Sequence, residues 1–192
     1  MAIKSLDKSS IVRPQTTNSM LAGYSFQDYE LIESVFVAAT TTSVTFSNLN
    51  QYATEYKHLQ IRAVGRSTHS ANITALRVAF NGIGGTSYSI HGIYSNGGIG
   101  SYAFPNQSSA YCGLLTAASA TAGNFAGSVV DILDAFSSVK NKTIRTLLGS
   151  APHEVSIHSA AFLNTAAIDS MTLTADAGSI IAGSRFSLYG IR

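Results

Sequence analysis

Charge is scarce in this chain, because only 11% of its 192 residues are Asp, Glu, Lys or Arg. Soluble domains carry about a quarter charged residues on average. The net charge is only +2, which gives no argument for nucleic acid as a partner. Cys112 is the single cysteine, so an internal disulfide framework and a thiolate metal site are excluded. No stretch approaches the ~20 consecutive apolar residues of a membrane-spanning helix.

Apolar and aromatic residues are nevertheless plentiful, with 45% hydrophobic residues, nine Phe and nine Tyr. This composition argues against a disordered chain. The length suits one domain, or one domain plus an arm, that can bury a core without disulfides or metals. Cys112 lies in the apolar run "AYCGLL" and is predicted to be a small core residue.

The charged residues are unevenly distributed. Residues 78–130 contain no Asp, Glu, Lys or Arg. Freely soluble monomers usually keep charges spread over their surface. Two interpretations stay open: the segment is covered in an assembly, or it is a Gly/Ser-rich loop region.

Alternating apolar residues predict strands along most of the chain. In "GSRFSLYGIR", residues 183–192, Phe186 and Leu188 point one way and Arg185, Ser187 and Tyr189 the other. The same period predicts inward-facing apolar residues in three further segments. They are Val44 and Phe46 in the first, Leu59, Ile61 and Ala63 in the second, and Leu76, Val78 and Phe80 in the third. In "YELIESVFVA" it groups Glu33 with Val35 and Val37 on one face and Ile32 with Ser34 and Phe36 on the other. Asn81-Gly82 is a turn dipeptide, and residues 95–110 are expected to form a loop.

About ten short strands without a convincing amphipathic helix predict an all-β fold. We expect an antiparallel β-sandwich or jelly roll over residues 26–192.

Residues 1–25 show neither strand nor helix periodicity, and "MAIKSLDKSS" lacks the apolar region of a signal peptide. The segment is an extended arm that is either disordered or ordered on a partner, and we favour the partner. Its candidate docking residues are the spaced apolar side chains of Ile3, Leu6, Ile11, Met20 and Leu21.

Basic residues on one predicted strand suggest a subunit contact. Strand alternation places Arg62 and Arg66 on the outward face with His58. We expect a solvated or subunit-pairing face, on which Arg62 and Arg66 meet Glu30 and Glu33 of a neighbour.

No catalytic constellation is evident in the sequence. Asp131 and Asp134 are the most interesting carboxylate pair, but on a strand they point to opposite faces, and Asp134 is expected to accept turn hydrogen bonds. The five His residues lack zinc-site spacing. We therefore expect no enzyme activity, no metal and no cofactor.

A glycan-binding surface is the alternative to a purely structural role. Exposed aromatic residues and Asn in loops are the groups that would contact sugars. The candidates are Tyr88, Tyr94, Tyr102, Phe104 and Asn106. These aromatic residues could equally fill the core or a subunit seam.

Several stretches, taken in order, resemble a widespread group of tailed-bacteriophage virion proteins. They are "TSVTFSNL", "YKHLQIRAVGRS", "LRVAFNG…SYSIHG", "VVDILDAFSSVKNKTIR" and "GSRFSLYGIR". The resemblance covers the chain from about Ser34 to Arg192, and "MAIKSL…SMLAGY" at the beginning is also typical.

The resemblance implies a β-sandwich that assembles, often as a homotrimer, on the surface of the virion. The roles it implies are head decoration (cement protein) or a tail-fibre-like component. Its partners would be copies of itself, the major capsid or tail proteins, and under the alternative a host surface glycan, with no nucleic acid or membrane. Such a protein would be made in the host cytoplasm without a signal peptide.

Overall fold

The computed structural model describes residues 29–192. The expected arm, residues 1–25 with Ile3, Leu6, Ile11, Met20 and Leu21, lies outside the described residues. Within the described range the chain forms twelve strands and one short 3₁₀ helix, Leu49–Tyr52. The strands are β1 (Tyr29–Phe36), β2 (Ser43–Phe46), β3 (His58–Gly65), β4 (Ile73–Phe80), β5 (Tyr88–Ser95), β6 (Ile99–Gln107), β7 (Ala110–Thr116), β8 (Ala126–Leu133), β9 (Lys142–Ser150), β10 (Glu154–Phe162), β11 (Met171–Ala175) and β12 (Arg185–Ile191).

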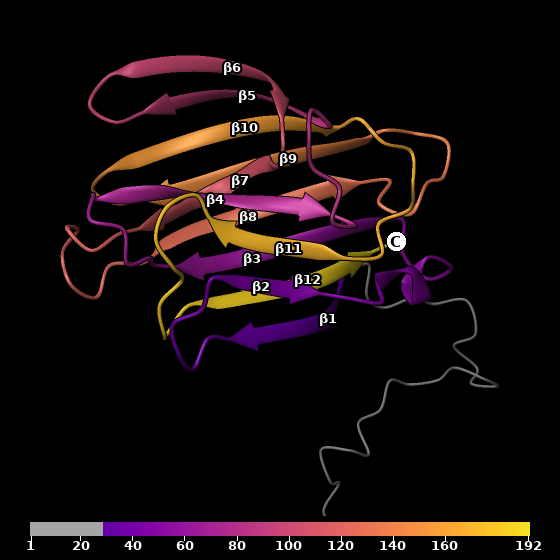
Figure 1. Ribbon diagram of the computed structural model, residues 1–192, viewed down its shortest axis with the longest axis horizontal. Helices are drawn as coiled ribbons and strands as arrows, with labels where there is room; N and C mark the ends of the chain where they lie inside the picture. The colour runs from indigo at the N-terminus through magenta and orange to yellow at the C-terminus, as the bar shows by residue number, and fades with distance from the viewer. Residues whose placement is uncertain (1–28) are drawn as a thin grey trace, which may run out of the picture.

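The strands form two antiparallel sheets that pack face to face, so the predicted β-sandwich is confirmed. The larger sheet has eight strands in the order β1-β12-β3-β8-β9-β10-β5-β6, and the smaller has four in the order β2-β11-β4-β7. Figure 1 shows the smaller sheet lying over the middle of the larger one, with the β5–β6 hairpin projecting beyond β7 at the top of the view. The larger sheet therefore has one face against the smaller sheet and one face turned away.

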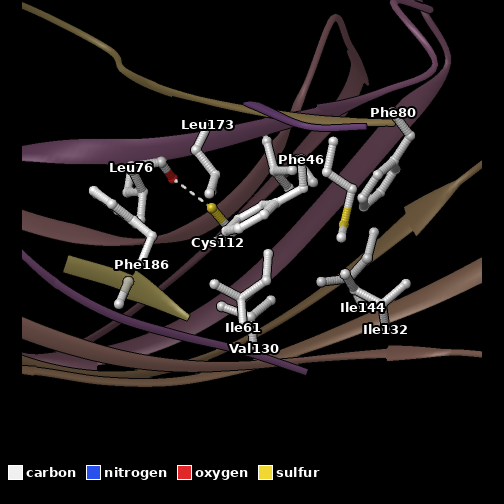
Figure 2. Packing of buried hydrophobic residues seen from close by; sticks show 14 of the residues in the cluster. Phe46, Ile61, Leu76, Phe80, Cys112, Val130, Ile132, Ile144, Leu173 and Phe186 are labelled. Atoms are coloured by element: carbon white, nitrogen blue, oxygen red, sulfur yellow. Dashed lines mark hydrogen bonds between the residues drawn. The ribbon is translucent and has the colours of Figure 1, made fainter. Parts of the chain in front are cut away.

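The core lies between the sheets and contains the inward residues that alternation predicts. Phe46, Ile61, Leu76 and Phe186 are fully buried there. Cys112 is buried among them, as predicted, and its thiol lies 3.4 Å from the carbonyl oxygen of Leu76 (Figure 2). The strand at residues 185–191 is confirmed as a core strand, because β12 lies between β1 and β3.

Of two connections predicted from the sequence, the structure confirms the turn at residues 81–82 and contradicts the loop at residues 95–110. Asn81 and Gly82 form the expected turn, with φ of 54° and 66°, but the turn leads into the other sheet instead of closing a hairpin. The expected loop at residues 95–110 is wrong, because β6 pairs with β5 over most of it. An edge strand that contains Pro105 and is largely exposed has no clear alternation, and the sequence pattern therefore hides it.

The grouping of Ile32 with Ser34 and Phe36 is wrong, whereas Glu33 and Val35 do share a face, because they are paired with the inward residues Leu188 and Phe186. The register between β1 and β12 shifts between Leu31 and Glu33, which leaves Ile32 as an extra residue. Across this β-bulge, Ile32 and Val35 both pack against the core. A bulge changes the phase of alternation within one strand, and alternation alone does not reveal it.

Candidate assembly surface

The face of the eight-stranded sheet that is turned away from the smaller sheet, called here the outer face, carries most of the exposed large hydrophobic residues. Strand alternation and the pairing register place them there. They are Tyr29, Leu31, Phe36, Val64, Ile93, Ile99, Val129, Leu147, Val155 and Ile157. Soluble monomers rarely expose a contiguous apolar patch larger than a few hundred Å². This face is therefore the candidate functional surface.

Four of these side chains form a continuous apolar ridge across four neighbouring strands. Val129 on β8 is paired with Leu147 on β9, Leu147 with Ile157 on β10, and Ile157 with Ile93 on β5. Leu147 and Ile157 are 56% and 55% exposed. Directly paired residues on one face have Cβ atoms about 5 Å apart. The four side chains thus form one uninterrupted line, named here the ridge.

Beside the ridge lies a strip without side chains. Gly127 on β8 is paired with Gly149 on β9, two residues along each strand from Val129 and Leu147. A Cβ atom added at either glycine would have no neighbouring heavy atom within 4 Å. Val64 and Val155 are paired with Gly127 and Gly149 and bound the strip at its two ends. We call this glycine strip the hollow.

A hydrogen-bonded polar network lies on the opposite side of the ridge. The amide nitrogen of Gln60 lies 2.7 Å from the Tyr29 hydroxyl and 2.8 Å from a carboxylate oxygen of Asp131. The other Asp131 oxygen accepts a hydrogen bond from Arg145 at 3.1 Å. Arg62 donates to Gln60 at 3.1 Å, and its guanidinium lies 4.8 Å from the centroid of the Tyr189 ring. The network pairs Asp131 with Arg145 and orients Arg62, which limits the desolvation cost if this face is covered.

A shallow groove of 730 Å³ opens on the outer face over β9, β10, β5 and β6. Two residues of the ridge, Ile93 and Ile157, form its aliphatic lining, and hydroxyl groups, a guanidinium and an imidazole surround them. Its lining includes His91, Ile93, Ser101, Arg145, Ile157 and Ser159. Its volume falls within the ~300–1,000 Å³ of small-molecule sites.

The expected pairing of charges between subunits stays a prediction, and the structure shows where its residues lie in one chain. Arg62 and Glu33 are exposed, and Glu30 accepts a hydrogen bond from the Tyr56 hydroxyl at 2.5 Å. The outward placement of Arg66 is wrong, because its side chain is buried and donates to backbone carbonyl groups of residues 118–124. β3 ends at Gly65, so the alternation that predicted an outward Arg66 no longer applies there.

The residues proposed for glycan contact lie on strands rather than in a loop. Tyr88 is fully buried in the core, and its hydroxyl accepts a hydrogen bond from the backbone of Phe80, so it is not available to a ligand. Tyr94, Tyr102 and Phe104 do come together, with ring centroids 6.1 Å and 5.1 Å apart. Asn106 is exposed, at a φ of 57° near the end of β6.

His158 is buried behind these rings, on the face of β10 that meets the smaller sheet. Its ring lies 5.5 Å from that of Tyr102 and 4.8 Å from that of Tyr111. Neither imidazole nitrogen has a hydrogen-bond partner among the described residues. Burial lowers the pKa of His158 from 6.5 to about 4, so the imidazole is neutral at pH 7.

The two carboxylates considered for catalysis are held by separate partners. Asp131 belongs to the network on the outer face, while Asp134 lies in the turn after β8 and accepts a hydrogen bond from Lys140 at 2.7 Å. The Asp134 carbonyl also accepts the Ser137 amide at 3.0 Å, in agreement with the predicted turn role. Residues 29–192 contain no group of three or more His, Cys, Asp or Glu placed to hold a metal ion.

Sequence reasoning missed the ridge, although a signal for it was present. Val129-Val130 and Leu147-Leu148 are adjacent apolar pairs within strands, and one member of each pair must face away from the core. On β10 the pattern is inverted, because Val155 and Ile157 are exposed while Ser156 and His158 are buried.

No protein-family model matches the chain, and no curated protein matches it significantly. No helix within residues 29–192 is both long and apolar enough to cross a membrane.

Proposed function

We propose that this chain is a structural subunit of a tailed-bacteriophage particle. In this proposal the β-sandwich associates with other protein surfaces, including copies of itself, and residues 1–25 anchor it to a capsid or tail protein. The role is head decoration or that of a fibre or adaptor, on the virion surface and without catalysis. The observation that carries the proposal is the apolar outer face, which needs a protein surface to cover it.

The resemblance of the sequence to virion proteins supplies the biological setting, and the outer face supplies the physical reason for assembly. Burying apolar area contributes about 25 cal/mol per Å². The polar network beside the ridge already satisfies Gln60 and Asp131 within the chain. A protein partner can therefore cover this face without leaving these groups unpaired.

The proposal is tested by gold-labelled antibody against this chain on purified particles from the source lysate. A regular array of label over heads supports decoration, and label confined to the tail supports a fibre or adaptor role. Particles without label would overturn the proposal. Deleting residues 1–24 should leave a folded domain that no longer attaches, and unfolding of the truncated chain would contradict the role of the arm.

A receptor- or glycan-binding tail module is the second candidate, and the groove on the outer face favours it. Arg145 and His91 offer donors, Ser101 and Ser159 offer hydroxyl groups, and Ile157 offers an apolar surface for a sugar ring. The measurement is a glycan array of host polysaccharides probed with the full chain. Binding that is lost in Ser159→Val and Arg145→Met supports this candidate, and a blank array removes it.

A further inference from the structure

We infer that the β5–β6 hairpin opens in acid, because one proton taken up by His158 displaces the ring of Tyr102 and separates β6 from β5. This change belongs to the β-sandwich itself and does not depend on the proposed role in a virion. Its basis is the way in which a tyrosine of an edge strand covers a buried imidazole that has no hydrogen-bond partner among the described residues.

Tyr102 reaches across three strands. It lies on β6 and is paired with Gly92 on β5, and Gly92 is paired on its other side with His158 on β10. A Cβ atom on Gly92 would lie 2.5 Å from Cζ of Tyr102 and 2.9 Å from Cδ2 of His158. The phenol ring therefore lies in the space that the glycine leaves open. There it contacts the imidazole edge-on, with 5.5 Å between the ring centroids.

β6 is the strand beside His158 that can move at least cost. It lies at the edge of the larger sheet, is paired with β5 alone among the described strands, and has no buried residue (Figure 1). β5 is paired with β10 along its whole length and stays in place. β7 covers His158 with Tyr111, but every other residue of β7 is buried. Water therefore reaches His158 most easily by displacement of β6.

The closed hairpin gives His158 no group that could stabilise a positive charge. The residue is only 2% exposed. Thr146 on β9 is paired with His158, and its hydroxyl is buried without a hydrogen-bond partner, as is the hydroxyl of Tyr102. Neither hydroxyl is bonded to the imidazole. Because a buried charge is costly without such bonds, a protonated His158 favours the open hairpin, in which water can solvate it.

The charged groups on the smaller sheet do not replace this water. The guanidinium of Arg77 on β4 lies 5.1 Å from the centroid of the Tyr111 ring and is hydrogen-bonded to Asp176 at 3.0 Å. The other ionisable groups that point between the sheets from neighbouring strands are phenols and a thiol, which carry no charge in acid. They are Tyr102 on β6, Tyr111 and Cys112 on β7, and Tyr88 and Tyr94 on β5.

The charged groups on the same side of the larger sheet lie farther along the strands. Glu154 is four residues from His158 on β10, about 14 Å along the strand, and it accepts a hydrogen bond from Ser156 at 2.9 Å. Lys142 is four residues from Thr146 on β9 in the opposite direction, and its ammonium group donates to backbone carbonyl groups. No carboxylate thus contacts the imidazole in the closed hairpin.

The direction and size of the effect follow from proton linkage. In the open hairpin water reaches the imidazole, which then has its ordinary pKa of 6.5, whereas in the closed hairpin burial lowers the pKa to about 4. The closed form is therefore fully favoured above pH 6.5, and the open form gains as the pH falls from 6.5 to 4. Each pH unit in this window raises the opening constant up to ten-fold, roughly 300-fold in all.

The experiment is hydrogen exchange of the full chain between pH 7.5 and 4, corrected for the intrinsic pH dependence of exchange. Peptides from β5 and β6 should lose protection by up to roughly 300-fold and should end less protected than those from β3. The loss should vanish in His158→Leu. It should persist in His91→Gln, the matched control at an exposed histidine of the same hairpin. Unchanged protection of β5 and β6, or protection equal to that of β3 at pH 4, would overturn the inference.

Gly92→Ala tests the position of Tyr102 without acid. The added methyl group occupies the space of the phenol ring, so the hairpin should open at pH 7. The titration of His158, followed by the NMR signal of its Cε1 proton, should then move from near pH 4 towards 6.5. Gly98→Ala, where a Cβ atom meets open space, is the matched control in the same hairpin and should leave the titration unchanged.

A folded Gly92→Ala variant with an unchanged His158 titration would overturn the inference, and circular dichroism establishes whether each variant is folded. Where a variant fails to fold, exchange in the wild-type chain still decides, because it compares β5 and β6 with β3 in one molecule. These outcomes are also independent of the proposed function, because none of them uses virus particles.

Discussion

The guanidinium group of Arg66 lies 2.8 Å from the carbonyl oxygen of Thr121, a residue 55 positions away in the sequence. The same group also donates to the carbonyl oxygens of Ala120 at 2.8 Å and Asn124 at 3.0 Å. The segment that it holds, residues 117–125, joins the two sheets and consists mostly of Ala, Thr, Ser and Gly. Arg66 therefore holds the later part of this connection, while backbone hydrogen bonds from residues 117–119 to residues 69–72 hold its beginning.

Replacing this arginine should destabilise the domain strongly. Arg66→Met keeps the apolar stem but leaves several buried carbonyl groups without a donor, which costs about 3 kcal/mol of unfolding free energy. Urea denaturation followed by circular dichroism measures the change. Arg185→Met is the matched control at an exposed arginine and should cost less than about 1 kcal/mol. Equal effects of the two substitutions would contradict the role given to Arg66.

Acidification should weaken the fold through His158. Because the folded-state pKa of about 4 lies below 6.5, the unfolded chain takes up this proton first as the pH falls. The contribution is fully present above pH 6.5 and is lost between pH 6.5 and 4, by up to roughly 3 kcal/mol. In His158→Leu this part of the pH dependence should vanish, whereas the exposed His91→Gln should retain it. Unfolding curves at half-unit pH steps provide the comparison.

Gly190 on β12 should not tolerate a side chain. A Cβ atom there would lie 2.3 Å from the ring of Tyr56, which is itself buried and hydrogen-bonded to Glu30. Gly190→Ala should cost about 1–3 kcal/mol, as overpacking in a core does. Gly98→Ala, where a Cβ atom meets open space, should change stability by less than about 0.5 kcal/mol. A thermal melt of both variants would settle whether Tyr56 can move aside.

The thiol of Cys112 should be inert in the folded protein. It is fully buried, and burial raises its pKa far above its ordinary value, so thiolate is scarce at neutral pH. An aromatic disulfide reagent should label the protein only after denaturant is added. Rapid labelling of the native chain would show that the strands around β7 open, and it would contradict the packing seen in Figure 2.

The sequence predicted the elements whose two faces differ clearly in polarity. Phe186 and Leu188 alternate with Arg185 and Ser187, so the period gave both the strand and its inward side. On β10 the period was visible, but the side chains that face the core are Ser156 and His158, which hydrophobicity would place outside. Packing between the sheets decides such cases, and a single strand does not contain that information.

The ridge on the outer face was missed for the same reason, because a single strand does not show which of two adjacent apolar residues faces the core. Whether Leu147 or Leu148 faces the core depends on the register of β9 against its neighbours. Once that register is set, the other leucine is left on the surface. The ridge is therefore a property of four paired strands, and the pairing of Val129, Leu147, Ile157 and Ile93 becomes visible only in the assembled sheet.

The strand order also has a consequence for how the chain acquires its structure. Within the described sheet β1 pairs with β12 alone, and β12 joins it to β3. Until β12 is synthesised and inserted, β1 has no place in the sheet, and β3 presents an open edge on that side. Contacts between strands so distant in sequence form slowly, and open edges invite pairing with other chains. A nascent chain in which residues 185–191 have not yet emerged is consequently the species most exposed to misassembly and to chaperones.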